Sequence, residues 1–311
     1  MRRYLIRRLL ASVVTVIGAT FVVFALSRVA GDPLLLYAQP EGYGRTPEQI
    51  RALEKHLGLD KPFIIQYLVW VKNTLQGDLG QSLAGERRVT KVILEKVGAT
   101  TQLALAGWAL ATFVGVPIGI ISAVYRGTIW DYLGRFVALF GQAIPNFWLG
   151  IVMVLLFSVW QEWLPSGLRG ATFDIRFFIM PAIVVGTSSM AGYLRITRSS
   201  MLEILDSEFI RLARGKGASP TAVIWKHALR NSLIQPITLS TLLLAGLLNG
   251  TLVAEAVFAW PGLGRTMLEA VNNNDFPVLT GGVLVFVIIY VVFSLAADLL
   301  YIVIDPRIRY T

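Results

Sequence analysis

The segment 211–231, RLARGKGASPTAVIWKHALRN, is strongly basic, although the chain on either side of it is apolar enough to sit in lipid. The segment holds six Lys, Arg and His side chains and a glycine-containing break, GKG. Because Lys and Arg concentrate in the cytoplasmic loops of membrane proteins, this pattern indicates a loop between two transmembrane helices. The rest of the sequence decides whether that interpretation holds.

The composition is that of a membrane protein. Of the 311 residues, 55% are hydrophobic and only 15% are charged. Most of the length lies in nearly uncharged runs of about 20 residues, which match the ~30 Å hydrocarbon core of a bilayer. The absence of cysteine excludes disulfides, thiolate catalysis and Cys-type metal sites. The two histidines, His56 and His227, are too far apart in sequence to indicate a His-rich centre.

Six apolar runs predict six transmembrane helices. The first follows the basic opening MRRYLIRR; it is too long for a signal peptide, and Arg28 stands where a cleavage site needs a small residue. The expected spans are 9–27, 99–124, 136–160, 178–194, 233–258 and 278–304. The predicted fold is therefore an all-α polytopic membrane protein.

The charges predict the orientation. Fifteen Lys and Arg residues fall on the segments that six spans would leave in the cytoplasm, whereas the two short outer loops hold only Arg169, Arg176 and Arg265. The positive-inside rule therefore places both termini in the cytoplasm. The long outer segment is discounted, because the rule does not govern loops of that length.

The spans divide the chain into three parts. Residues 1–30 hold the basic N-terminus and the first span, 31–98 form an extracytoplasmic helical insertion, and 99–311 form a five-helix core with a cytoplasmic loop at 195–232. Within the insertion, TPEQIRALEKHLGL has a Thr cap followed by Pro at the first helical position. Two short helices are expected in this small domain.

Several residues inside the predicted spans are unusual for lipid. Gly115 with Gly119, and Gly246 with Gly250, have the GxxxG spacing that lets another helix approach closely, and ordinary helix packing explains them. Pro145 predicts a kink in the third span, because proline cannot donate to the Gly141 carbonyl.

Polar side chains at the depth of the membrane are candidates for a solute pathway. The candidate pathway residues are Gln142, Pro145, Asn146, Asn249 and Glu255. Hydrogen bonding between helices is the alternative role, and Glu255 also has the alternative of reaching the outer headgroups.

The basic segment itself predicts a helix-turn-helix. Ser207 caps a helix that runs to about Arg214, GKG ends it, and Ser219 with Pro220 begins another. Nucleic-acid binding is disfavoured, because the positive-inside rule already accounts for the cations. The Gly-Lys pair is no phosphate loop either, since Gly217 follows where Ser or Thr is required.

A basic amphipathic helix lying on anionic lipid is an alternative for this segment, with Phe209, Leu212, Val223, Ile224 and Trp225 buried. That alternative leaves unexplained the small residues Ala213, Gly217 and Ala218 around the break. Small side chains expose backbone for close approach, which favours docking of a protein partner.

The segment resembles the EAA loop of binding-protein-dependent ABC importer permeases. Arg211, Leu212 and Ala213 take the places of Glu-Ala-Ala, Gly217 takes the glycine position, and the final proline is displaced to Pro236. ARGKG followed by HALRNSLIQP is similar to the peptide-transporter variant of that loop. GDLGQS, IPNFWLG, RITRSSMLEIL, AEAVFAWPGLGR and DLLYIVIDPRIR extend the resemblance over nearly the whole chain. Together they resemble the B-type permease subunit of dipeptide, oligopeptide and nickel ABC importers.

The resemblance implies a half-channel in a bacterial inner membrane. Its expected partners are a second homologous permease, two ATPase subunits that bind ATP and Mg, an external substrate-binding protein and the lipid bilayer, but no nucleic acid. No catalytic residue, metal site or cofactor is expected in this chain. Short peptides are the favoured solute, with nickel chelates, glutathione, opines and oligosaccharides as alternatives.

The resemblance also assigns two sets of contact residues. A coupling helix that docks on the ATPase would use Phe209, Arg211, Leu212, Ala213, Arg214, Lys216, Gly217, Ala218, Ser219 and His227. The segment WPGLGR, with an interfacial Trp260 followed by a short outer helix, is expected near the binding protein through Trp260, Gly262 and Arg265.

Two other functional classes compete with this hypothesis. A self-sufficient secondary transporter or channel would need coupling-ion sites or repeated halves with broken helices, and the sequence has no visible inverted repeat. A membrane-bound enzyme would need a constellation of acid, base or metal-ligating residues, and no such pattern is recognisable.

Overall fold

A computed structural model describes residues 2–29, 48, 51, 60–85, 87–168 and 174–304; side chains at 2–5, 238, 241–242, 244–245, 247–250, 297–298 and 300–304 are not described. Over these ranges the chain is helical apart from turns and one isolated bridge between Gln81 and Arg88. The all-α prediction is confirmed. The helix predicted within 46–59 lies outside the described residues, apart from Glu48 and Arg51.

The contacts divide the chain into two compact units. The first comprises Met1–Gly98 and Gly262–Ile289, and the second comprises Ala99–Pro261 and Tyr290–Thr311. Two long helices, α5 (Val89–Val124) and α14 (Phe276–Ile304), contribute residues to both units.

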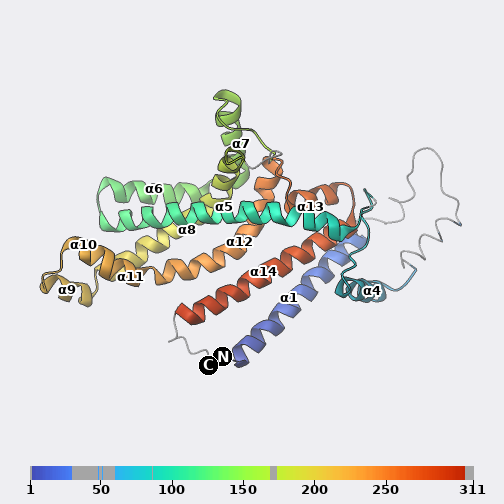
Figure 1. The fold of residues 1–311 in the computed structure, drawn as a ribbon, viewed down its shortest axis with the longest axis horizontal. Coiled ribbons are helices and arrows are strands. Elements are labelled where there is room, and N and C mark those ends of the chain that lie inside the picture. The colour runs from blue at the N-terminus through green and yellow to red at the C-terminus, as the bar shows by residue number, and fades with distance from the viewer. Residues whose placement is uncertain are drawn as a thin grey trace. The chain divides into compact units, whose positions relative to one another are not determined.

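The first unit is built around the first turns of two long helices, α5 and α14. It contains α1 (Arg2–Val29), α4 (Phe63–Leu75), α13 (Leu263–Asn272) and the first turns of α5 and α14 (Figure 1). Its buried core comprises Val89, Ile93, Leu263, Ala270 and Val278. The Asp275 carboxylate caps the start of α14 and also accepts hydrogen bonds from the Ser82 hydroxyl and the Leu83 amide. This carboxylate therefore holds the turn before α5 against the start of α14.

The second unit contains α6 (Ile129–Ala143), α7 (Asn146–Met153), η1 (Val154–Trp160), α8 (Arg176–Leu205) and α12 (Ile234–Val257). α8 packs against α6, α7 and α12, so it is the central helix of this unit. The largest buried side chains of its core include Leu103, Met180, Phe258 and Trp260.

Four of the described helices are long and apolar enough to cross a membrane. They are Ile6–Arg28 of α1, all of α5, all of α8 and Phe276–Ala296 of α14. α6 and α7–η1 pass the same test only as a bent pair. α12 lies where the fifth span is predicted, but many of its side chains are not described. The count of six spans therefore stays a prediction.

Two helices are longer than the hydrophobic runs that predict them. α5 begins at Val89, ten residues before the expected start, and its 36 residues extend about 54 Å. α8 continues to Leu205, past the expected end at residue 194. The hydrophobic pattern marks only the most apolar part of each helix, whereas the backbone hydrogen bonds of the helix continue through the more polar residues next to it.

The kink predicted at Pro145 is a complete break. α6 ends at Ala143, α7 begins at Asn146, and the helix pair bends by 103°. Proline restricts the preceding residue to extended backbone, and Ile144 has φ −79° and ψ 126°. The predicted third span is thus either a broken span or a re-entrant segment.

The glycines of the second predicted span accommodate α8. A Cβ built on Gly115 would lie 2.7 Å from the Met190 carbonyl oxygen, and one on Gly119 would lie 2.8 Å from that of Leu194. Real Cβ atoms do not approach backbone this closely, so both positions require glycine. In contrast, a Cβ on Gly246 would meet nothing within 4 Å among the side chains that the structure describes.

Gly119→Leu is expected to destabilise the second unit by about 1–3 kcal/mol, because the added side chain must push α8 away from α5. The amount of intact protein surviving a series of heating steps in detergent measures this. Gly18→Leu in α1 is the matched control, since a Cβ there meets nothing within 4 Å. Equal losses for both variants would contradict the close α5–α8 contact.

Candidate functional site

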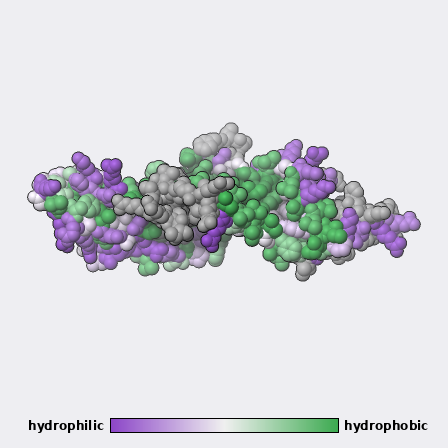
Figure 2. Space-filling view, turned by 90° about the horizontal axis from the view of Figure 1, so that it is seen from below, coloured by the Kyte–Doolittle hydropathy of each residue, from purple (hydrophilic) through white to green (hydrophobic). Residues whose placement is uncertain are grey.

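The segment between α8 and α12 folds as two helical pieces joined by a tight turn. α9 (Glu208–Gly215) comes first, and the second piece is one continuous run of α10 (Pro220–Ala222), η2 (Val223–Ala228) and α11 (Leu229–Ser232). As predicted, Ser219 caps the second piece, because its Oγ accepts a hydrogen bond from the Ala222 amide at 3.3 Å. Figure 2 shows hydrophilic side chains gathered at the end of the molecule that carries α9 and α10.

Ser207 begins α9 in a different way from the one predicted. Its backbone is extended, as a cap requires, with φ −75° and ψ 155°. Its hydroxyl donates to the Ile204 carbonyl at 2.5 Å instead of accepting from an α9 amide. The helix boundary is predicted correctly, but the capping bond is not.

Gly217 closes α9 through a left-handed turn. Its φ is +82°, a region that side chains other than Asn and Asp rarely adopt. The Gly217 amide donates to the Arg214 carbonyl at 3.0 Å and the Ala218 amide to the Ala213 carbonyl at 3.1 Å, which satisfies the end of the helix. A Cβ built on Gly217 would meet nothing within 4 Å among the described residues, so they leave the space beyond this turn open.

The predicted docking residues form a mainly exposed surface. Phe209, Arg211, Leu212, Arg214, Lys216, Gly217 and Ser219 are exposed, while Ala213, Ala218 and His227 are half-buried. Leu212 and Trp225 are each 60% exposed, which is unusual for large apolar side chains at a strongly cationic end of a protein. Within α9, Arg211 pairs with Glu208 at 2.8 Å, and both of these side chains remain largely exposed.

A small core fixes this surface to the second unit. Ile210 of α9 and Val223 and Ala228 of η2 are buried together with Met201 of α8 and Ala123 of α5. The Ser200 hydroxyl adds a hydrogen bond of 2.8 Å to the Ser232 carbonyl. The segment is therefore a packed element attached to the end of α8, and not a loose loop.

A buried ion pair next to this core ties the α5–α6 turn to α8. Asp131, which is 1% exposed, accepts hydrogen bonds from Arg198 Nε at 2.8 Å and Nη2 at 3.1 Å. The Ser122 hydroxyl at 2.9 Å and the Gly127 amide at 3.0 Å complete its coordination. Arg135 lies 3.4 Å away as a second, more exposed cation.

Sequence reasoning missed this ion pair. Arg198 was counted only as one of the cytoplasmic cations, and Asp131 was not singled out. Its signal in the sequence is the run RGTIWDYLGR, residues 126–135, in which a single acid stands between Arg126 and Arg135 at the start of an apolar helix. The partner on α8 is 67 positions away in sequence, so no local spacing reveals it.

The candidate pathway residues occupy different environments. Gln142 and Pro145 are exposed and Asn146 is half-buried, all three at the break between α6 and α7. Glu255 is fully buried, and the Thr100 hydroxyl donates to its Oε1 at 2.7 Å. The Asn249 side chain lies outside the described residues. A pathway role stays a prediction for this set, with Glu255 enclosed between α5 and α12 in this conformation.

The expectation of an interfacial Trp260 is not met. Its indole is fully buried, its Nε1 donates to the Ala99 carbonyl at 3.0 Å, and its ring packs edge-on against Phe178. The following helix is present as predicted, as α13. In the first unit, Gly262 precedes α13 and is buried, whereas Arg265 is partly exposed and pairs with Glu269 at 2.8 Å. Of these three residues, Arg265 is the one whose side chain is accessible to a partner.

Comparison with known proteins identifies the family. Residues 115–310 match the family described as binding-protein-dependent transport system inner membrane component, and residues 1–104 match the N-terminal family of the same transport systems. The chain belongs to this family. This membership and its apolar helices agree with a multi-pass protein of the inner membrane.

Two relatives are similar to this chain over essentially its whole length and theirs. The oligopeptide transport system permease protein AppB of Bacillus subtilis is 37% identical over 319 residues, covering 100% of both chains. The dipeptide transport system permease protein DppB of Escherichia coli K12 is 36% identical over 341 residues, covering 100% of this chain and 99% of DppB.

Solved structures of ABC transporters share the fold. The inward-facing MetNI methionine ABC transporter contains a chain with a TM-score of 0.54 and 19% identity, covering 69% of this family member and 96% of that chain. An amino acid ABC transporter crystallised with histidines contains a chain with a TM-score of 0.55 at 12% identity. The match covers 68% of this chain and 94% of that chain. At these identities the likeness establishes the fold of the permease alone.

Proposed function

We propose that the chain is the transmembrane permease subunit of an ATP-driven importer and forms half of the translocation pathway for short peptides. The observation that carries the proposal is the exposed basic and apolar surface of α9 and its turn, fixed to the end of α8 in a member of this family. The names of AppB and DppB support peptides as the solute class.

The proposed assembly contains a second homologous permease, two ATPase subunits and an external binding protein. ATP and Mg would be bound by the ATPase subunits. Both termini, and with them the coupling segment, would lie in the cytoplasm, as the distribution of Lys and Arg predicts.

We propose that the coupling surface, which comprises α9 and the turn to Ser219, docks in a groove of an ATPase subunit. Leu212 and Phe209 offer exposed apolar area, and Arg211, Arg214 and Lys216 offer positive charge for acidic residues at the rim. The open space beyond Gly217 permits close approach of the partner backbone. On docking, the apolar side chains would lose their contact with water and the charges would lie at the rim. This arrangement is typical of a protein interface.

The packing beneath the surface supports a mechanical role. A switch from a 1:99 to a 99:1 population of two conformations requires about 5.5 kcal/mol of differential binding. A flexible loop would change shape without transmitting this binding energy to the helices, whereas packed elements change position as units. The Ile210–Met201 core and the Asp131–Arg198 pair join the coupling surface to α8, α5 and α6, so movement of the surface would move these helices.

Purification of the tagged chain from its native membrane tests the proposal. We expect ATPase subunits and a second permease to co-purify. Uptake in proteoliposomes should require ATP on the side of the membrane that corresponds to the cytoplasm, and the binding protein on the opposite side. Mass spectrometry of the ligand carried by the binding protein identifies the solute. Uptake by the chain alone, driven by an ion gradient, would instead establish the secondary transporter.

A further inference from the structure

Helix α4 carries two apolar faces, and the first of them packs on α1. The rings of Phe63, Tyr67 and Trp70 contact those of Phe21 and Phe24, with centroids 5.2–6.0 Å apart. The Tyr67 hydroxyl lies 3.0 Å from Thr20 Oγ1 and donates to the Ile17 carbonyl at 3.1 Å. α4 is thereby fixed along the outer third of α1.

The second face of α4 is apolar and exposed. It comprises Ile64, Ile65, Leu68, Val69 and Leu75, which are 42–84% exposed. Residues 64, 68 and 75 recur with the period of one helix face, and 65 and 69 adjoin them over the first two turns. Lys72 lies between these two rows in the third turn, where its long side chain can extend toward headgroups while its stem covers apolar surface. This stripe of five apolar side chains on a 13-residue helix is unfavourable in water.

The position of α4 along α1 indicates what covers this stripe. The part of α1 that is long and apolar enough to cross a membrane runs from Ile6 to Arg28, so in the predicted orientation we place the outer boundary at Arg28. From the helical rise, Phe24 and Phe21 lie about 6 Å and 10 Å inside that boundary. This is the depth at which amphipathic helices bury their apolar face, about 5–10 Å into the boundary between headgroups and acyl chains.

The apolar stripe lies at the same depth as exposed apolar residues of α1. Val22 and Leu26 lie two residues on either side of Phe24, so they are on the face of α1 opposite the one that packs on α4, and they are 53% and 59% exposed. Because α1 is long and apolar enough to span a membrane, such side chains at this level are suited to acyl chains. We therefore expect acyl chains at the same depth beside the stripe of α4.

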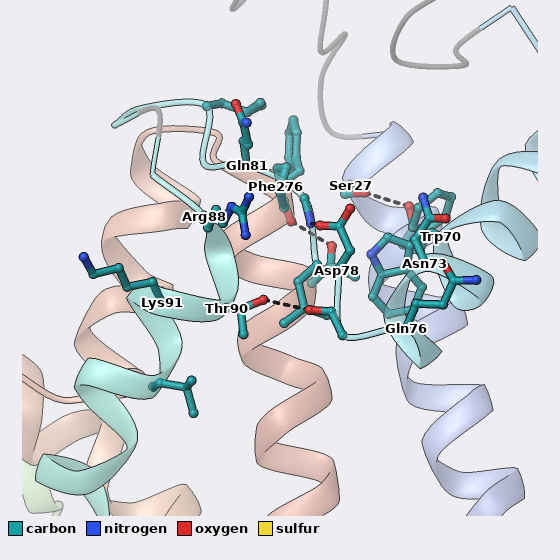
Figure 3. A pocket seen from close by; sticks show the side chains of 18 of the residues that line it. Ser27, Trp70, Asn73, Gln76, Asp78, Gln81, Arg88, Thr90, Lys91 and Phe276 are labelled. Carbon is teal, nitrogen blue, oxygen red and sulfur yellow. Dashed lines mark hydrogen bonds between the residues drawn. The ribbon is translucent and has the colours of Figure 1, made fainter.

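The remaining side of α4 carries Asn73 and Gln76. With Trp70, they line an open cavity of about 1390 Å³ whose opposite wall carries Arg88 and Lys91 (Figure 3). Phe24, Leu79 and Phe276 add apolar area to the lining, but the charged and amide groups need water or headgroups as partners. α4 thus separates an apolar environment from a polar one, which a helix within an entirely aqueous domain does not need to do.

We propose that α4 is an interfacial helix seated on the outer leaflet of the membrane. Ile64, Ile65, Leu68, Val69 and Leu75 lie among the acyl chains, and the cavity side faces water. Its 13 residues extend only about 20 Å, too short to cross the ~30 Å hydrocarbon core. Part of the extracytoplasmic insertion is accordingly a membrane-bound platform that holds the outer end of α1.

Spin labels on single cysteines test the proposal, and the absence of native cysteine makes the labelling specific. Leu68→Cys is labelled in the assembled importer in liposomes, with Asn73→Cys on the polar side of α4 as the matched control. Collisions of each label with oxygen, which concentrates in lipid, and with a water-soluble nickel chelate are measured. We expect the Leu68 label to collide several-fold more with oxygen than with the chelate, and the Asn73 label to do the reverse.

Two results would overturn the proposal. Preferential collision of the Leu68 label with the chelate would place the stripe in water. Shielding of that label from both reagents would mean that a second permease or the binding protein covers it. If the labelled Leu68→Cys variant fails to assemble, the same collisions are measured for a label on Ile64→Cys, one turn earlier on the same face.

Discussion

Asp131→Ala is expected to destabilise the permease by about 3–5 kcal/mol, because it leaves the Arg198 guanidinium without its partner in a largely buried site. The Asp131 side chain is 2% exposed and that of Arg198 22%, so water replaces little of the lost interaction. The variant also removes the acceptor of the Ser122 and Gly127 hydrogen bonds. Thermal unfolding of the purified importer, followed by the loss of intact complex in size-exclusion chromatography, measures the effect.

The control for this prediction is a second ion pair, between the α5–α6 turn and the residue that follows α8. Arg126 and Asp206 lie 3.2 Å apart but are 63% and 69% exposed, so Asp206→Ala is expected to cost about 0–1 kcal/mol. Adding Arg198→Leu to Asp131→Ala removes the unpaired charge, and this double variant should recover part of the lost stability. Similar melting curves for Asp131→Ala and Asp206→Ala would refute the role of the buried pair.

Gly217→Asn is expected to abolish most solute uptake while the protein still reaches the membrane. Asparagine tolerates the left-handed backbone at φ +82°, so the turn itself should persist. The new side chain would fill the open space into which we place the ATPase subunit. Uptake into proteoliposomes should fall by more than tenfold, a loss of at least about 1.4 kcal/mol of coupling. ATP hydrolysis should no longer respond to solute.

Gly127→Asn is a closely matched control. Gly127 also has a left-handed backbone, with φ +77°, and a Cβ there also meets nothing within 4 Å in the described part of the chain. It lies in the α5–α6 turn, outside the predicted coupling surface, so transport should be nearly unchanged. Gly217→Ala separates the two physical causes, because alanine is smaller than asparagine but less tolerant of a left-handed backbone. Normal solute-stimulated hydrolysis in Gly217→Asn would argue against docking at this turn.

Much of the coupling segment could be predicted because its signals are local. Ser219 and Pro220 mark a helix start through their own backbone preferences, and GKG marks the end of the preceding helix. The break at Pro145 follows from a missing amide and a steric clash within one turn. The extent of α5 and α8 was less predictable, because hydrophobicity reports the lipid-embedded part of a helix and not its full length.

The sequence by itself determined that this chain is helical and membrane-spanning, since uncharged runs of this length must satisfy their backbone hydrogen bonds within lipid. It also determined which residues of the chain form the cationic loop, because the helix ends that bound the loop are marked by charges and capping residues next to them. Tertiary structure alone decided that α8 fills the Gly115–Gly119 groove, that Asp131 pairs with Arg198, that Trp260 is buried and that α4 has two apolar faces. These features join residues far apart in the chain, and close packing of side chains in three dimensions selects such partners without leaving a pattern in local spacing.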